Sequence, residues 1–266
     1  MHDLEKCSRF IRKRSLELVY SKKASHIGGA YSIADILSFL YGKYLNVTPA
    51  NVKDQNRDRL FYSKGHACTS LYAALECFGF VSKAELDTFT DNGSIFTSHV
   101  SHNIKGVELS TGSLGHALSV ASGVAYSGKI KNLQYKTICI VSDGELNEGS
   151  NWEAIMFLGH HKMNNLTLVV DYNKIQSFGR VDDVLKLDPL TDKFKSFGFQ
   201  VEEIDGHNFH EIEKAFNKST EGKPKVIIAN TIKGKGVSFM EDRLEWHYKS
   251  PTVEQYNLAL KEIGEN

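Results

Sequence analysis

Two short segments decide the fold of this 266-residue chain: Ile140-Val141-Ser142-Asp143-Gly144-Glu145 and Val169-Val170-Asp171-Tyr172-Asn173-Lys174-Ile175. Each segment is an apolar run that ends in polar side chains able to bind a ligand. Short apolar runs bounded by polar residues are typical of strands buried on both faces of a sheet. A helical stretch at 151–162 separates the two runs, so they form one βαβ unit with parallel strands.

The same alternation continues through the second half of the chain. Apolar runs and helical stretches follow one another at residues 137–141, 151–162, 166–170, 189–197, 199–204, 210–218 and 225–229. This order predicts an α/β fold, a doubly wound and mostly parallel sheet with helices on both faces. Apolar spacing predicts two more helices, at 4–18 and 33–40, with a polar, glycine-rich loop at 25–30. Because no linker or composition break interrupts the chain, we expect one domain over residues 1–266.

Asp143 and Asn173 follow neighbouring strands of the predicted sheet. In open parallel sheets a ligand binds outside the carboxyl ends of the strands, so these two side chains should meet there. Their oxygens, with the backbone carbonyl of Ile175, are ligands that Mg²⁺ prefers, and Ca²⁺ or Mn²⁺ could substitute. Mg²⁺ commonly completes its shell with phosphate oxygens. The pair therefore predicts a metal site that also holds a diphosphate.

The turn after Asp143 suits an anion. Gly144 lets the backbone approach a phosphate, and Gly149 leads into a helix whose N-terminus attracts negative charge. The spacing is similar to that of a P-loop, but Ser150-Asn151 stands where that motif requires Lys-Ser or Lys-Thr, which excludes an NTPase. Each fragment alone is also consistent with an ordinary turn or strand cap, whereas both together at this spacing favour a site.

The stretch 142–154, continued by Asp171-Tyr172-Asn173, resembles the thiamine diphosphate motif, which opens with Gly-Asp-Gly and closes with Asn after the next strand. Ser142 replaces the first glycine. Further segments are similar to transketolase motifs and occur in the order of that family: Ser25-His26-Ile27-Gly28-Gly29, Ser63-Lys64-Gly65-His66-Ala67, and the glycine-rich loop 106–115. The chain thus resembles the diphosphate-binding, N-terminal part of transketolases over almost its whole length.

This resemblance implies a thiamine diphosphate cofactor bound together with Mg²⁺. The implied metal ligands are Asp143, Asn173 and the carbonyl of Ile175, and Asn173 would also face the diphosphate. The other implied cofactor-binding residues are His66, Gly112, Ser113, Leu114, Gly144, Glu145 and His247.

The implied catalytic residues are His26, His66, His99, His247 and Glu148. His26 and His247 would exchange protons with sugar oxygens, while His66 and His99 would bind ketose hydroxyls. Imidazole suits this chemistry because making and breaking a carbon–carbon bond beside a hydroxyl requires proton transfer at neutral pH. Glu148 and Glu153 resemble glutamates that couple paired cofactors at a subunit interface, although at a helix start they could equally be solvated.

Several positions depart from the family pattern or leave alternatives open. His99 and His102 compete for one role, and we expect His99 to fill it. His116 stands where the family usually has Gln, and Ala117 where it has Gly. The histidines expected to be exposed or structural are His2, His160, His161, His207 and His210.

The overall charge excludes two classes of partner. Lys and Arg total 32, as do Asp and Glu, so no net field would attract nucleic acid or an anionic membrane. Affinity for a phosphate must be local, and Lys233 and Lys235 could attract a sugar phosphate or simply be solvated. The four cysteines form no C-x-x-C pair, and no apolar run reaches the length of a membrane span. We therefore expect a cytoplasmic protein with reduced thiols.

The resemblance also implies a partner. In transketolases the glutamate that activates the cofactor belongs to a second, pyrimidine-binding domain, and this chain contains no such segment. We therefore expect a separate subunit that carries that domain, and a heterotetramer of two copies of each chain. The implied reaction is transfer of a two-carbon ketol unit from a ketose or ketose phosphate to an aldose.

Three alternatives remain beside this interpretation. The α subunit of a 2-oxo-acid dehydrogenase shares the diphosphate motif but lacks the His26 and His66 loops. Deoxyxylulose phosphate synthase resembles transketolase but is normally one longer chain. A thiamine diphosphate-binding or interaction subunit without catalysis would not require His26, His66, Asp143 and Asn173 together.

Overall fold

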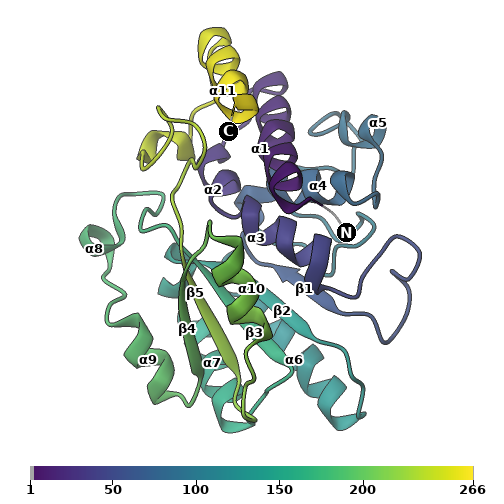
Figure 1. Cartoon of the computed structure of the whole chain (residues 1–266), viewed down its shortest axis with the longest axis vertical. Coiled ribbons are helices and arrows are strands. Elements are labelled where there is room, and N and C mark those ends of the chain that lie inside the picture. Colours follow the sequence, from purple (N-terminus) through teal and green to yellow (C-terminus); the bar gives the residue numbers. More distant parts are fainter. Residues whose placement is uncertain (1–2, 266) are drawn as a thin grey trace.

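The computed structural model describes residues 3–265 and contains a five-stranded sheet in which all neighbouring strands are parallel (Figure 1). The strands lie in the order β1-β2-β3-β5-β4, with bounds β1 (Arg59–Tyr62), β2 (Thr137–Ser142), β3 (Leu166–Tyr172), β4 (Gln200–Asp205) and β5 (Lys225–Asn230). The predicted α/β fold is confirmed, and the last four strands coincide with the predicted apolar runs.

Helices surround the sheet. The α-helices are α1 (Leu4–Ser21), α2 (Ile27–Ser32), α3 (Ala34–Phe39), α4 (Cys68–Cys77), α5 (Lys83–Leu86), α6 (Ala117–Ile130), α7 (Gly149–His160), α8 (Val181–Val184), α9 (Leu190–Ser196), α10 (Phe209–Asn217) and α11 (Val253–Glu265). A π-helical turn, η1 (Leu40–Tyr44), and three 3₁₀ turns, η2 (Gly65–Ala67), η3 (Gly144–Asn147) and η4 (Leu244–His247), complete the elements.

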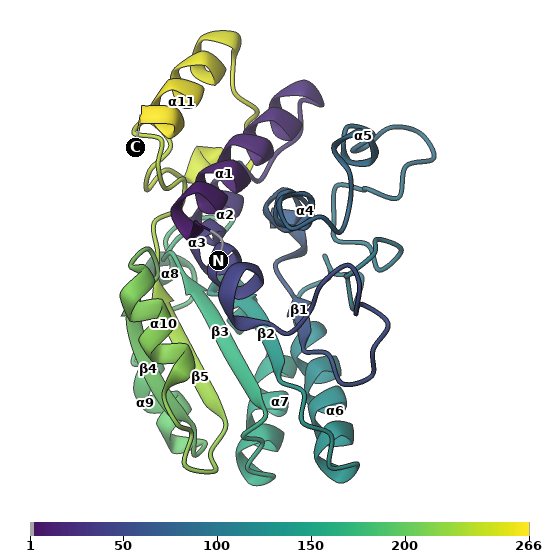
Figure 2. The same cartoon turned by 45° about the vertical axis from the view of Figure 1, so that its right-hand side comes forward.

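Both faces of the sheet are covered, which explains why its strands are continuously apolar. Successive side chains of a strand point to opposite faces. Ile138 and Ile140 of β2 pack with α1, α3, α4 and α10, whereas Cys139 and Val141 pack with α6, α7 and α9. Figures 1 and 2 show the two helical layers on either side of the sheet.

A third cluster lies beyond the carboxyl ends of the strands. Here α1, α2, η4 and α11 pack around buried Tyr31, Trp246 and Ala259 (Figure 2). This packing brings the start of α2, which follows His26, against η4, which ends at His247. The backbone N–H of His26 donates to the carbonyl of His247 over 3.0 Å. Two distant segments of the chain therefore meet above the sheet.

One local expectation was wrong, and one strand was not predicted. The predicted loop at 25–30 is only partly a loop, because α2 begins at Ile27. Gly28 serves a close contact within that helix, since a Cβ there would lie 2.9 Å from Cγ of Lys233. The apolar pattern also gave no prediction of β1, because its four residues are too few to show a period.

Candidate functional site

A cavity of about 330 Å³, which we call the central cavity, opens at the carboxyl ends of β1, β2 and β3. Its walls come from the strand ends, the start of α2 and the segment after β5. The residues that line it include His26, Lys64, His66, Leu114, Asp143, Gly144, Glu148, Asn173, Ile175, Gln176, Lys233 and His247. The predicted edge of the sheet is thus the edge where the cavity lies.

Asp143 lies on the cavity wall as an almost fully buried carboxylate without a cationic partner among the described residues. Its Oδ1 accepts from the backbone N–H of Gly144 at 2.7 Å, and its Oδ2 accepts from that of Lys174 at 2.6 Å. Burial raises the pKa of Asp143 to about 6, and the nearby Asp171 carboxylate adds to this rise. A divalent cation would compensate this negative charge, so the side chain fits a metal ligand.

Asn173 and Ile175 supply two neutral oxygens beside Asp143. The Asn173 Oδ1 accepts from the Ile175 N–H at 3.2 Å, which orients the amide. The Ile175 carbonyl accepts from Nζ of Lys233 at 3.1 Å. The three predicted metal ligands therefore border one cavity. Within residues 3–265 no group of three or more His, Cys, Asp or Glu side chains could hold a metal, so a metal here depends on this mixed oxygen set.

Four histidine rings form a cluster, and three of them, His26, His66 and His247, line the central cavity. The ring of His26 lies 5.0 Å from that of His66, 4.8 Å from His247 and 6.4 Å from His99, and His66 lies 4.7 Å from His99. His26 occupies the left-handed region at φ 70°, and its Nδ1 bonds the Ser25 hydroxyl at 2.8 Å. The structure brings all four predicted histidines together.

The competing His102 lies elsewhere. Its Nδ1 bonds the Ser110 hydroxyl at 2.7 Å and its side chain is exposed. Of the two alternatives, only His99 has ring contacts with the cluster. Gly112 passes close to the His99 ring, and a Cβ at this glycine would lie 2.8 Å from the ring. The predicted cofactor loop and the histidine cluster are therefore in direct contact.

Three of the clustered histidines favour the neutral form. Burial, followed by the proximity of His66, lowers the pKa of His26 to about 4. Burial and Lys233 lower that of His247 to about 3, and burial also lowers the pKa of His66. The Lys233 ammonium donates to Nδ1 of His247 over 3.2 Å, so that nitrogen is an acceptor. Neutral rings of this kind each present one hydrogen-bond donor and one acceptor at physiological pH.

We predict that His26→Asn changes the pH dependence of stability. A histidine whose pKa is lowered on folding destabilises the folded state as pH falls from about 6.5 towards 4, because only the unfolded chain takes up the proton. Asn tolerates the left-handed backbone of this position. Urea unfolding should show the wild type losing free energy of unfolding relative to the variant between pH 7 and pH 5. A difference that stays constant with pH would contradict the prediction, and His210→Asn, an exposed site, is the control.

Some predicted cofactor residues do not line the central cavity. Among Gly112, Ser113 and Leu114, only Leu114 lines it, and Ser113 is exposed. The side chain of Glu145 is fully buried, accepts from the Ser63 hydroxyl and the Gly115 N–H, and has its pKa raised to about 7 by burial. We infer that Glu145 holds the cofactor loop rather than facing the cavity.

Exposed residues surround the start of α6 and α7. Glu148 is the N-cap residue of α7 and lines the central cavity, although its side chain makes no capping hydrogen bond. Glu153, within α7, and His116, which precedes α6, are exposed. Ala117 is buried. Of the remaining histidines, His160 and His210 are exposed, and His2 lies outside the described residues. His161 packs against Tyr126 and Phe157, and His207 bonds the Asp35 carboxylate.

Sequence reasoning missed a buried ionic network under the cavity. Asp171 is fully buried and accepts from the Lys64 ammonium, from the Thr231 hydroxyl, and from the Ser32 hydroxyl at 2.6 Å. Burial opposes ionisation of Asp171, but Lys64 lowers its pKa below the usual value. Lys64 also donates to the Gly29 carbonyl at 2.8 Å. The network joins the ends of β1, β3 and β5 to α2, and only the position of Lys64 inside the second histidine motif could have suggested it.

Two other side chains in the cavity wall present donors. Lys233 is 2% exposed, and burial, with Lys64 nearby, lowers its pKa to about 8. The Nε2 of Gln176 is buried without a hydrogen-bond partner among the described residues. Lys235, in contrast, lies outside the cavity and pairs with Glu241 at 3.5 Å. The sequence suggested the same role for Lys233 and Lys235, but only Lys233 lines the central cavity.

Comparison with known proteins agrees with this geometry. A family model described as "Transketolase, thiamine diphosphate binding domain" matches residues 4–262. A subunit of the apulose-4-phosphate transketolase of Phocaeicola vulgatus is 40% identical over 98% of this chain and 94% of its own length. The 6-deoxy-6-sulfo-D-fructose transketolase subunit SqwG of a Clostridium species is 39% identical over 98% and 96%.

Solved structures agree with these sequence matches. Transketolase of Campylobacter jejuni has a TM-score of 0.92 and 32% identity over 98% of this chain, which spans 42% of the Campylobacter chain. No helix within residues 3–265 has the length and apolar character needed to cross a membrane. The chain therefore belongs to the transketolase family and is matched over residues 4–262 by that family's thiamine diphosphate binding domain.

Proposed function

We propose that this chain is the diphosphate-binding subunit of a transketolase that moves a two-carbon ketol unit from a ketose to an aldose, with thiamine diphosphate and Mg²⁺ as cofactors. One observation carries the proposal. The central cavity is lined by a carboxylate, two neutral oxygens and three histidines with lowered pKa values, and the ring of a fourth histidine, His99, lies against two of these three. Such a cavity suits a diphosphate with its metal beside a sugar.

In this proposal the oxygen ligands, Lys233 and Gln176 bind the metal and the diphosphate, and the histidines bind the sugar. Asp143, Asn173 and the Ile175 carbonyl bind the metal, while Lys233 and the free Nε2 of Gln176 donate to diphosphate oxygens. When bound, thiamine diphosphate supplies the carbon centre that carries the ketol unit. The protein contributes orientation and charge compensation at the phosphate end.

The histidines handle protons at the sugar end. His26 and His247 are neutral at pH 7. Because Nδ1 of His247 accepts from Lys233, its Nε2 carries the proton and can donate to a substrate oxygen, while the unprotonated nitrogen of His26 can accept from a substrate hydroxyl. His66 and His99 lie beside His26 and can donate hydrogen bonds to neighbouring hydroxyls. Glu148 at the cavity wall and exposed Glu153 are proposed to face a second copy of the chain.

We further propose a partner subunit that carries the pyrimidine-binding domain, in a cytoplasmic heterotetramer with two copies of each chain. The support is that both bacterial relatives are named as transketolase subunits and match this chain over nearly their whole lengths. Both are also named for sugars that carry a phosphate or a sulfonate group. An anionic ketose is therefore the donor class we favour.

The experiment is to mix the chain with a candidate partner subunit that carries a transketolase pyrimidine-binding domain, thiamine diphosphate and Mg²⁺, and to follow ketol transfer from xylulose 5-phosphate to ribose 5-phosphate. We expect transfer only in the full mixture, with loss on chelation of the metal. Transfer by the chain alone would contradict the partner proposal. Cofactor binding without transfer from any phosphorylated or sulfonated ketose would contradict the reaction and favour a binding subunit.

A 2-oxo-acid dehydrogenase activity is the alternative within enzymes. Its test is decarboxylation of pyruvate or a branched 2-oxo acid by the same mixture. The four-histidine cluster argues against it, because a 2-oxo acid presents no row of hydroxyls for the rings to bind.

A further inference from the structure

We propose that His207 is a positioning residue for Lys233, acting through the backbone N–H of Ile232. This inference rests on the proposed function, because it concerns the lysine that is proposed to bind the cofactor diphosphate. His207 follows β4, at the edge of the sheet, and its side chain is 11% exposed. It does not line the central cavity, so any effect on the cofactor must pass through other residues.

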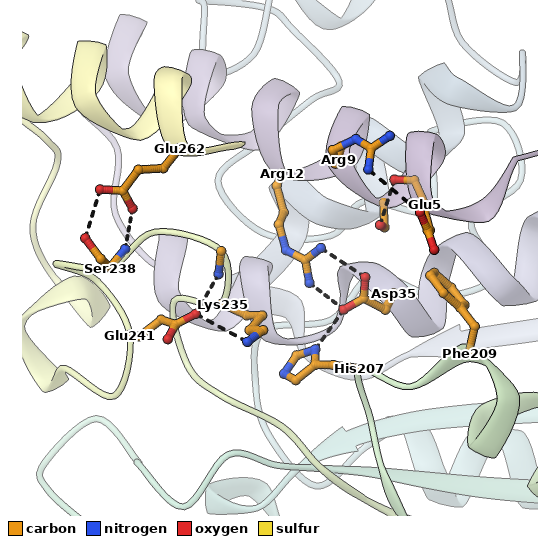
Figure 3. A pocket seen from close by; sticks show the side chains of 12 residues that line it. Glu5, Arg9, Arg12, Asp35, His207, Phe209, Lys235, Ser238, Glu241 and Glu262 are labelled. Atoms are coloured by element: carbon orange, nitrogen blue, oxygen red, sulfur yellow. Dashed lines mark hydrogen bonds and ion pairs between the residues drawn. The ribbon is translucent and has the colours of Figure 1, made fainter. Parts of the chain in front are cut away.

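Both ring nitrogens of His207 are engaged, and their roles are fixed. The Ile232 N–H donates to Nε2 at 2.9 Å, so Nε2 carries no proton. Nδ1 then carries the proton and donates to the Asp35 carboxylate at 2.7 Å. Figure 3 shows the ring beside that carboxylate. A histidine bonded in this way is locked in one tautomer and one orientation.

Asp35 is itself anchored, which makes His207 a rigid acceptor. Arg12 of α1 makes two bonds to the Asp35 carboxylate, at 2.9 and 2.5 Å (Figure 3). Arg12 also donates to the Tyr31 carbonyl at 3.3 Å, and the side chains of the pair are 9% and 7% exposed. Although burial favours the protonated acid, Arg12 and His207 together hold the pKa of Asp35 below its usual range.

The chain needs such an anchor at Ile232 because the sheet ends just before it. β5 ends at Asn230, and the N–H of Thr231 makes the last bond to β3, at 3.3 Å to the Tyr172 carbonyl. Ile232 is next, and its N–H goes to His207 instead of a strand. Lys233 follows directly, and its ammonium donates hydrogen bonds to the Ile175 carbonyl and to Nδ1 of His247. His207 thus fixes the peptide between Thr231 and Ile232, one residue before Lys233.

The Arg12–Asp35–His207 network lies in the wall of a second cavity. This cavity has a volume of about 510 Å³ and shares no lining residue with the central cavity. At its other side Ser238 donates to Glu262 and Lys235 pairs with Glu241 (Figure 3). Within this cavity Arg12 and Lys235 each have an acidic partner. The network is therefore assigned to support of Lys233 rather than to a ligand of its own.

Two substitutions separate the two bonds of His207. In His207→Asn the amide nitrogen replaces Nδ1 and keeps the bond to Asp35, but nothing reaches the Ile232 N–H. In His207→Gln the side-chain oxygen replaces Nε2 and keeps the bond to Ile232, but the bond to Asp35 is lost. Positioning of Lys233 requires only the Ile232 bond. We therefore expect the Asn variant, and not the Gln variant, to weaken cofactor binding.

The measurement is isothermal titration of the chain plus partner with thiamine diphosphate in the presence of Mg²⁺, together with the thermal unfolding midpoint. His207→Asn should bind about tenfold more weakly, as expected for loss of one hydrogen bond to a buried amide, while His207→Gln should bind like the wild type. The maximal rate at saturating cofactor should change little. His210→Asn, on exposed His210 of α10, is the matched control.

A double-mutant cycle tests the route through Lys233. In a Lys233→Met background, His207→Asn should cause no further loss of affinity. Additive losses of affinity from His207→Asn and Lys233→Met would overturn the proposal. It would also be overturned if His207→Asn and His207→Gln lost the same affinity for thiamine diphosphate in proportion to a fall in their thermal unfolding midpoints. Failure of the wild-type mixture to bind thiamine diphosphate would instead refute the proposed function, so the two failures are distinguishable.

Discussion

Asp143→Asn is expected to abolish metal-dependent binding of thiamine diphosphate and, with it, ketol transfer. Asp143 is the one carboxylate among the predicted metal ligands, and the variant keeps its shape but removes its charge. Substitution of residues that merely support a metal ligand costs about 10–100-fold in affinity, so loss of the charged ligand itself should cost at least about 100-fold. We expect titration with thiamine diphosphate and Mg²⁺ to show no saturable binding.

The same variant should gain stability relative to the wild type as the pH rises, when no cofactor is present. The pKa of Asp143 is raised on folding to about 6, so the folded state is penalised once the carboxyl ionises. The penalty grows as pH rises from about 4 to 6 and is complete above 6, because the unfolded chain ionises first. Urea unfolding should therefore show the free energy of unfolding of Asp143→Asn rising relative to that of the wild type between pH 4 and pH 7.5.

These two results together distinguish a ligand site from an ordinary turn. If Asp143 only capped a turn, its removal would lower stability and leave cofactor binding intact. A variant that binds the cofactor normally would contradict the metal assignment. The matched control is Asp192→Asn, because the Asp192 side chain is 73% exposed and lies on α9.

Lys64→Met is expected to destabilise the folded chain by about 3–5 kcal/mol, the usual cost of removing one partner of a buried ion pair. The Asp171 carboxylate is fully buried, and Lys64 is its cationic partner. Met has a similar length and keeps the apolar contacts of the side chain. The Ser32 and Thr231 hydroxyls would still donate to Asp171, but they carry no compensating charge.

Urea unfolding at pH 7 measures this loss, and a second substitution tests its cause. Adding Asp171→Asn to Lys64→Met removes the uncompensated charge and should restore a large part of the stability. A double variant as unstable as Lys64→Met would show that the lysine acts through packing alone. Lys195→Met is the control, since the Lys195 side chain is 61% exposed.

The sheet could be predicted because its strands are buried on both faces. Runs such as 137–141 and 166–170 are apolar throughout, and helices of ordinary length separate them. β1 has only four residues and follows a polar loop, so it carries no comparable pattern. The short helix α2 was missed because its glycines are typical of loops, whereas Gly28 is there to admit the Lys233 side chain.

Only those residues of the site that belong to short local sequence motifs could be predicted. Asp143 and Asn173 stand at strand ends, so topology alone brings them to one edge. The buried network could not be predicted, because Lys64 and Asp171 are 107 positions apart and their contact depends on tertiary structure. His207 was expected to be structural or exposed, and its partner Asp35 lies 172 positions away. Contacts of this kind leave no local sequence pattern.

The strand order β1-β2-β3-β5-β4 has a consequence for the way the chain is made. Within residues 3–265 β4 pairs only with β5, which lies between β4 and β3 and is synthesised after both. While the polypeptide leaves the ribosome, β1, β2 and β3 can assemble first, but β3 keeps an open edge until β5 emerges. Thr231 arrives with β5, so the charge of Asp171 gains this donor late in biogenesis. A ribosome-stalled nascent chain that ends before residue 225 should therefore leave one edge of β3 unpaired and be prone to aggregation.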